Sequence, residues 1–171
     1  MIKTLWPALA AIGAGLVLFA TAAGAGLAVA IPVGGVAVVE IAWGFSVLRA
    51  ERLVVPRAAV AGGAVGILGS GFLLLTGPLA LIPFLALFVF HWWIAIAAVI
   101  EVRSLRAAPA ASGRPRRTGV FALVLVAEAM LVAAIATPAL AASEAGEFAV
   151  PHGTSHGASH GAAHETTPAG Q

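Results

Sequence analysis

The sequence predicts an all-α integral membrane protein, a bundle of five transmembrane helices followed by a polar C-terminal tail. Hydrophobic residues make up 61% of the 171 residues and charged residues only 9%, whereas soluble domains carry about 25% charged residues. Apolar runs of roughly 20 residues, the length that crosses a bilayer, recur along the chain. The basic residues lie in short segments between these runs, where lysine and arginine set the orientation of membrane proteins.

The first expected span covers about residues 5–25 and follows Lys3. Gly24-Ala25-Gly26 is expected to form a tight turn into the second span. A signal peptide cleaved near Ala25 is the alternative interpretation of this segment. However, the apolar run continues to residue 39 without a polar break, which favours a hairpin of two spans.

Turns and short basic segments separate the later spans. The third span places Gly62, Gly66 and Ser70 at four-residue spacing, an arrangement that lets helix backbones pack closely. Thr76-Gly77-Pro78 predicts a turn before the fourth span, and the segment Glu101–Thr118 is expected to be a loop before the fifth. The spans of the membrane domain, residues 1–140, are expected at about 5–25, 27–48, 58–76, 79–100 and 119–140, and the tail, 141–171, is expected to be disordered.

Five spans place every basic residue of the chain on one side of the membrane. Because positive charge stays in the cytoplasm, we expect a plasma membrane protein with a cytoplasmic N-terminus and an extracytoplasmic tail. Dropping one span from the middle of the chain would scatter these charges over both sides. The residues concerned are Lys3, Arg49, Arg52, Arg57, Arg103, Arg106, Arg114, Arg116 and Arg117.

The first four spans are candidates for two duplicated hairpins. Offsetting the chain by 51 residues aligns Ile31-Pro32 with Ile82-Pro83, and also pairs Gly15 with Gly66, Gly26 with Gly77 and Arg52 with Arg103. A composition this rich in Ala, Gly, Val and Leu produces some matches by chance. A parallel duplication, followed by an unrelated fifth helix, is therefore a hypothesis.

Three ionisable residues lie within the expected spans: Glu40, His91 and Glu128. At about 1.5 Å per residue, each is roughly 12–14 Å from the cytoplasmic end of its helix, close to the middle of the bilayer. Such groups are costly in lipid unless they are neutral, paired or hydrated. We expect an intramembrane polar layer that relays a proton or holds a cation. The alternative is that each group is satisfied separately by a neighbouring helix.

The tail repeats a histidine every fourth residue. Neutral imidazoles bind Cu, Zn and Ni, so the tail is a candidate site for one of these metals. The glycines between the histidines disfavour a stable helix, and a low-complexity linker or a pH-responsive segment are alternatives. A signal-like cleavage after Ala141 would release this segment. The candidate ligands are His152, His156, His160 and His164.

No motif of a soluble enzyme is present, and no residue is assigned a catalytic role. The sequence predicts a component that handles cations, either a transition metal or the proton. The first alternative is a structural or assembly subunit of a larger membrane complex. The second is a quinone-linked redox protein, which rests on His91 and on a pocket that includes Trp43, Trp92 and Trp93, although these side chains also suit bundle packing. The expected partners are the bilayer and either further copies of the chain or a larger membrane protein, and we expect no nucleic acid.

Overall fold

The computed structural model describes residues 2–107, 118–143 and 146. All five helices are long and apolar enough to cross a membrane, which confirms the predicted number of apolar helices. Both predicted turns are also confirmed, and Gly77 in the second has a φ of 98°, a left-handed value that suits glycine. The described residues form no strand and fold into α1 (Ile2–Gly24), α2 (Leu27–Ala50), α3 (Pro56–Thr76), α4 (Leu81–Ala107) and α5 (Thr118–Ala141).

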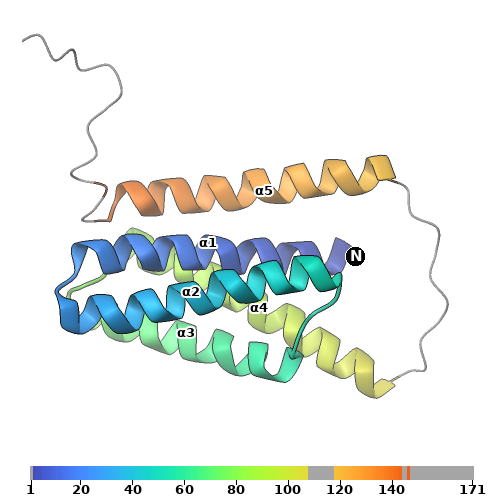
Figure 1. The fold of residues 1–171 in the computed structure, drawn as a ribbon, viewed down its shortest axis with the longest axis horizontal. Coiled ribbons are helices and arrows are strands. Elements are labelled where there is room, and N and C mark those ends of the chain that lie inside the picture. The colour runs from blue at the N-terminus through green and yellow to red at the C-terminus, as the bar shows by residue number, and fades with distance from the viewer. Residues whose placement is uncertain (1, 108–117, 144–145, 147–171) are drawn as a thin grey trace, which may run out of the picture.

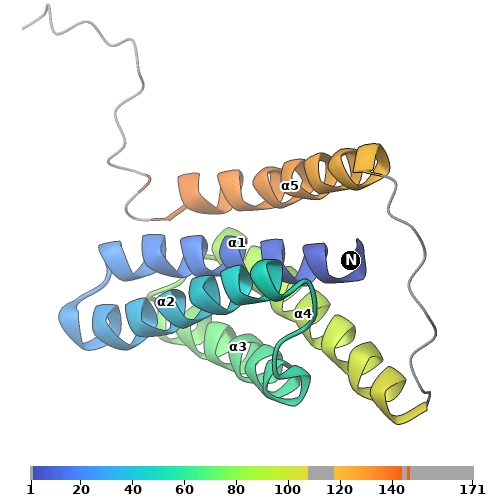
Figure 2. The ribbon, with the colours of Figure 1, turned by 45° about the vertical axis from the view of Figure 1, so that its right-hand side comes forward.

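Successive helices run in opposite directions (Figures 1 and 2). Helix α1 pairs with α2, α3 pairs with α4, and α1 packs on α4 to join the two hairpins. Helix α5 lies along α1 and α4. No backbone contact joins α2 to α3 within the described residues, so a groove separates these two helices. The predicted duplication of the hairpins stays a prediction.

Helix α1 forms the centre of the bundle. Of its apolar span, 67% is buried, against 11% of the span in α5. Its buried positions are mostly alanine or glycine, among them Ala8, Ala11 and Ala14, which are fully buried. A Cβ added at Gly44 of α2 would lie 2.7 Å from the carbonyl oxygen of Ala8, so the two backbones touch. Small residues thus provide the close helix contacts that membrane bundles use.

Helix α4 extends further than the sequence suggested. We expected a loop from Glu101, but the helix continues to Ala107, so this expectation was wrong. The apolar run ends at Ile100, whereas the following Glu, Arg, Leu and Ala residues are good helix formers. Ser104 also donates a hydrogen bond of 2.8 Å to the carbonyl oxygen of Glu101. Hydropathy indicates where the apolar span ends, at Ile100. The helix continues beyond that residue because the residues that follow have high helix propensity.

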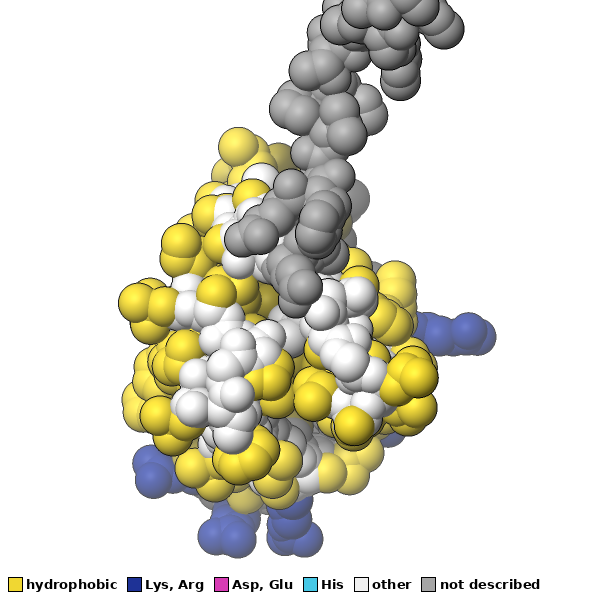
Figure 3. All heavy atoms as spheres, turned by 90° about the vertical axis from the view of Figure 1, so that its left-hand side faces the viewer, with side chains coloured by type: hydrophobic (Ala, Val, Ile, Leu, Met, Phe, Trp, Pro, Cys, Tyr) yellow, Lys and Arg dark blue, Asp and Glu magenta, His cyan; other side chains and the backbone are white. Residues whose placement is uncertain are grey.

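The described arginines gather at one end of the bundle, where α2 and α4 end and α3 begins. Figure 3 looks onto the opposite end, which shows hydrophobic and small side chains with basic side chains only behind its rim. The arginines concerned are Arg49, Arg52, Arg57, Arg103 and Arg106. The three arginines of the sequence at 114, 116 and 117 lie outside the described residues.

Candidate functional site

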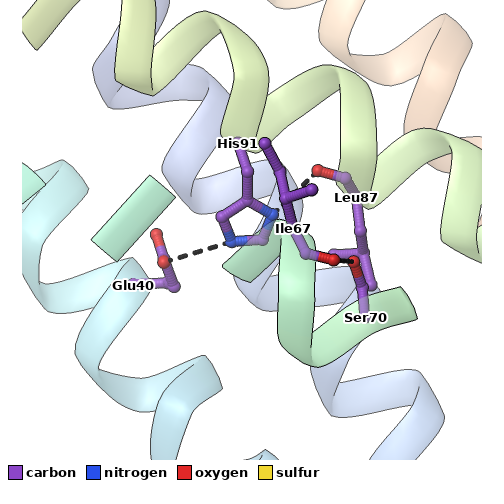
Figure 4. A network of polar contacts seen from close by, with 5 residues as sticks. All are labelled: Glu40, Ile67, Ser70, Leu87 and His91. Carbon is purple, nitrogen blue, oxygen red and sulfur yellow. Dashed lines mark hydrogen bonds and ion pairs between the residues drawn. The ribbon is translucent and has the colours of Figure 1, made fainter. Parts of the chain in front are cut away.

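Two of the ionisable residues expected in the spans meet beside the groove between α2 and α3 (Figure 4). Nε2 of His91, on α4, lies 3.4 Å from Oε1 of Glu40, on α2. The side chain of His91 is 1% exposed and that of Glu40 is 16% exposed. A carboxyl group and an imidazole therefore face each other with little access to the surroundings.

The hydrogen bond on the far side of the ring determines its tautomer. Nδ1 of His91 lies 2.8 Å from the carbonyl oxygen of Leu87, one turn earlier in α4. A carbonyl oxygen only accepts, so Nδ1 must carry a hydrogen and donate it. Nε2 is then either an unprotonated acceptor in the neutral ring or an N–H donor in the imidazolium ion. Helix α4 thus holds the ring with Nε2 directed at Glu40.

The Glu40–His91 pair is suited to hold one proton. If the ring were neutral and Glu40 ionised, lone pairs of Nε2 and Oε1 would face each other. One added proton makes the contact attractive, as imidazolium with carboxylate or as imidazole with carboxylic acid. The distance of 3.4 Å is long for a hydrogen bond, and Nε2 has no other hydrogen-bond partner. The two atoms are therefore close to each other but not at the distance of a strong hydrogen bond.

Two glycines of α3 make room for His91. A Cβ added at Gly66 would overlap Cδ2 and Nε2 of the imidazole, and one added at Gly63 would lie 3.0 Å from the carbonyl oxygen of His91. Gly66, one of the small residues predicted to allow close helix packing, thus leaves the space that the imidazole of His91 occupies. By contrast, a Cβ at Gly62 would meet nothing within 4 Å, because this residue lines the open groove.

The groove between α2 and α3 has a volume of about 500 Å³. Among the described residues that line it, the polar side chains are those of Glu40, Ser70 and His91, and the others are apolar or glycine. Ser70 is 3% exposed and donates a hydrogen bond of 3.0 Å to the carbonyl oxygen of Ile67. A smaller cavity of about 170 Å³ shares Glu40 with the groove and extends it to Trp43. A largely apolar groove thus runs between the two helices, and it is polar at Glu40, Ser70 and His91.

Glu128 lies in a different part of the bundle. It lines a cavity of about 370 Å³ together with Trp6, Trp93 and Glu101. Within the described residues, no three His, Asp or Glu side chains are grouped so that they could hold a metal ion. The structure therefore brings Glu40 and His91 together and places Glu128 elsewhere. The candidate metal ligands of the tail, His152, His156, His160 and His164, lie outside the described residues.

The tryptophans grouped in the sequence occupy separate positions. Trp43 is partly buried and its Nε1 donates a hydrogen bond of 3.0 Å to the carbonyl oxygen of Val54. Trp92 is 52% exposed and stacks on Phe88 with ring centroids 6.0 Å apart. Trp93 packs edge to face against Trp6 at 5.9 Å. Only Trp43 borders the groove system, beside its smaller cavity.

Sequence reasoning missed the packing of Gly66 against His91 and the place of Ser70 in the groove. Their four-residue spacing was visible, but it signalled helix packing alone. Trp6 was also missed as a residue that lines the same cavity as Glu128. Hydropathy does not indicate which face of a helix contacts which neighbour. The positions of Gly66, Ser70 and Trp6 depend on the rotation of each helix about its own axis.

The fold and the site together define a class: a five-helix apolar bundle with one acid–imidazole pair beside a lateral groove. No protein-family model, curated protein or solved structure matches this chain.

Proposed function

We propose that this chain is a multi-pass membrane protein that handles a cation, the proton, at its Glu40–His91 pair. Its outer surface supports the membrane location, since Leu27 is 79% exposed, Leu75 87% and Leu123 71%. Exposing such side chains to water costs about 25 cal/mol per Å², whereas lipid tails accept them. Because the described arginines share one end, we place that end in the cytoplasm and the protein in the plasma membrane.

The 3.4 Å contact between Glu40 and His91 carries the functional proposal. The pair exchanges one proton: either Nε2 or Oε1 holds it, and its loss leaves two facing acceptors that favour its return. The groove gives a proton donor or acceptor access to Glu40 from one side. Ionisable residues within apolar helices typically mark ion pathways and proton relays, which supports this role.

We expect Glu40→Gln to abolish proton transfer. The amide keeps the shape of the side chain, but it neither gains nor loses a proton near neutral pH. The protein would be reconstituted into liposomes with an imposed pH gradient, and an internal pH-sensitive dye would report proton flux. Wild-type protein should dissipate the gradient, and the variant should match protein-free liposomes.

Glu128→Gln is the matched control, since it removes a second carboxyl group from the bundle but not from the groove. It should leave the proton flux at the wild-type level. Unchanged flux in Glu40→Gln would contradict the proposal. Equal loss in both variants would instead favour the three-residue layer of Glu40, His91 and Glu128.

A quinone-linked redox role is the second candidate. The groove volume of about 500 Å³ falls within the range of small-molecule sites. Its apolar walls suit an isoprenoid tail, and the Glu40–His91 pair suits a ring carbonyl that takes up a proton on reduction. This candidate requires that extracts of the purified protein contain a quinone, and its absence would count against the role.

An assembly role is supported by a different observation. Gly62 and Gly69 of α3 have open space around their Cα atoms, and such small residues accept a neighbouring helix in membranes. The neighbour would be a second copy of the chain or a larger membrane protein. Under this role, Glu40→Gln should reduce association or abundance in the membrane rather than proton flux alone.

Metal binding by the tail remains a sequence-based proposal. It is checked by calorimetric titration of Cu, Zn, Ni and Co into the full chain and into a chain ending at Ala142. Saturable binding that is lost with the tail supports a metal-gathering role for His152, His156, His160 and His164.

A further inference from the structure

The cavity around Glu128 combines features that the proton site does not use. Its lining comes from α1, the α2–α3 loop, α4 and α5, and its volume is about 370 Å³. Among the described residues, two carboxyl groups, those of Glu101 and Glu128, border it, and no lysine, arginine or histidine does. The other described lining residues are apolar or aromatic. The described lining therefore combines two acidic groups with hydrophobic side chains.

Two indole rings form a corner of this cavity. Trp6 and Trp93 meet edge to face, with ring centroids 5.9 Å apart and planes at 78°. In this arrangement at least one ring presents its electron-rich face away from the contact. Tryptophan is the side chain that attracts cations most strongly within about 6 Å of the ring centre. Aromatic rings beside a carboxylate favour an organic cation.

Two polar atoms of the lining residues are buried without a hydrogen-bond partner among the described residues. They are Oε2 of Glu128 and Nε1 of Trp6. A buried polar atom left unpaired costs about 1–3 kcal/mol, so a ligand that pairs with it, once the side chain turns toward the cavity, binds favourably. Oε2 accepts a hydrogen from a charged amine, and Nε1 donates to water or to an acceptor atom on the ligand.

We propose that this cavity binds an amine that is protonated and carries an apolar body. The N–H⁺ group pairs with Glu128, the indole rings of Trp6 and Trp93 face the charge, and the apolar body lies against Ile96 and Ile100. Small inorganic cations fit less well, because Mg²⁺ and Ca²⁺ need about six oxygen ligands. This site is independent of the Glu40–His91 pair and goes beyond the proposed proton exchange.

The test uses two ligands of nearly the same shape that differ in charge. Calorimetry of the full-length protein in detergent would compare 4-phenylbutylammonium with 4-phenylbutanol. The amine should bind saturably, and the alcohol should bind at least about tenfold more weakly, which corresponds to about 1.4 kcal/mol. Equal binding of the two would show that the cavity selects an apolar shape or a hydroxyl group, and would overturn the proposal.

Substitutions locate the binding site. Glu128→Gln should weaken amine binding about tenfold or more, while Glu40→Gln should leave it unchanged. Trp93→Leu provides a second variant, which leaves the carboxylate in place. Trp92→Leu is its control, because Trp92 is the next residue in the chain and does not line the cavity. Trp93→Leu should weaken binding and Trp92→Leu should not. Wild-type amine affinity in both Glu128→Gln and Trp93→Leu would overturn the proposal.

Discussion

Gly66→Ala is expected to destabilise the bundle by roughly 1–3 kcal/mol, the usual cost of overpacking a tight interface. The new methyl group would overlap the imidazole of His91, which is 1% exposed and bonded to Leu87. The ring cannot move away without losing that bond or the contact with Glu40. Thermal unfolding in detergent, followed by circular dichroism, measures the effect.

Gly69→Ala provides the control on the same helix. A Cβ at this position would meet nothing within 4 Å, and alanine is a better helix former than glycine by about 1 kcal/mol. This variant should be as stable as the wild type or slightly more stable. Equal destabilisation in the two variants would show that Gly66 does not form a specific seat for His91.

Removing both members of the Glu40–His91 pair is expected to cost less than the sum of the two single removals. Glu40→Leu leaves the buried Nε2 without its neighbour, and His91→Leu leaves the carboxyl group facing apolar walls. Each single change should destabilise by roughly 1–3 kcal/mol, the cost of a buried polar group left unpaired. The double variant has an entirely apolar contact, so it should lose less than the sum of the two single changes.

A double-mutant cycle measures this coupling. Residues in contact couple by about 0.5–3 kcal/mol, whereas distant residues are additive within about 0.5 kcal/mol. The cycle of Glu40→Leu with Glu128→Leu is the control, because the two carboxyl groups line different cavities. Additive effects in the Glu40–His91 cycle would contradict an interacting pair.

Hydropathy and turn residues were enough to predict the five helices and their order. The turns at Gly24–Gly26 and at Gly77 were readable because glycine interrupts long apolar runs there. The exception was the end of α4, where helix propensity continues after the apolar run stops at Ile100. Helix ends outside an apolar segment depend on helix propensity, which hydropathy does not register.

The candidate site was only partly accessible from the sequence. Glu40, His91 and Glu128 could be recognised, since an ionisable residue in an apolar run is conspicuous and its depth follows from counting residues. Which of them meet depends on the rotation of each helix, and these helices are apolar on every face. The packing of Gly66 on His91 provides the missing information, and it emerges only when α3 and α4 are placed together.

The protonation of the His91 ring is the most direct test of a proton held between Glu40 and His91. Nitrogen-15 solid-state NMR of histidine-labelled protein in lipid bilayers reports it, and His91→Gln identifies the signals. We predict a hydrogen on Nδ1, and an Nε2 signal that changes when Glu40 is replaced by Gln. A neutral ring protonated on Nε2 and bare at Nδ1, unaffected by Glu40→Gln, would contradict the account.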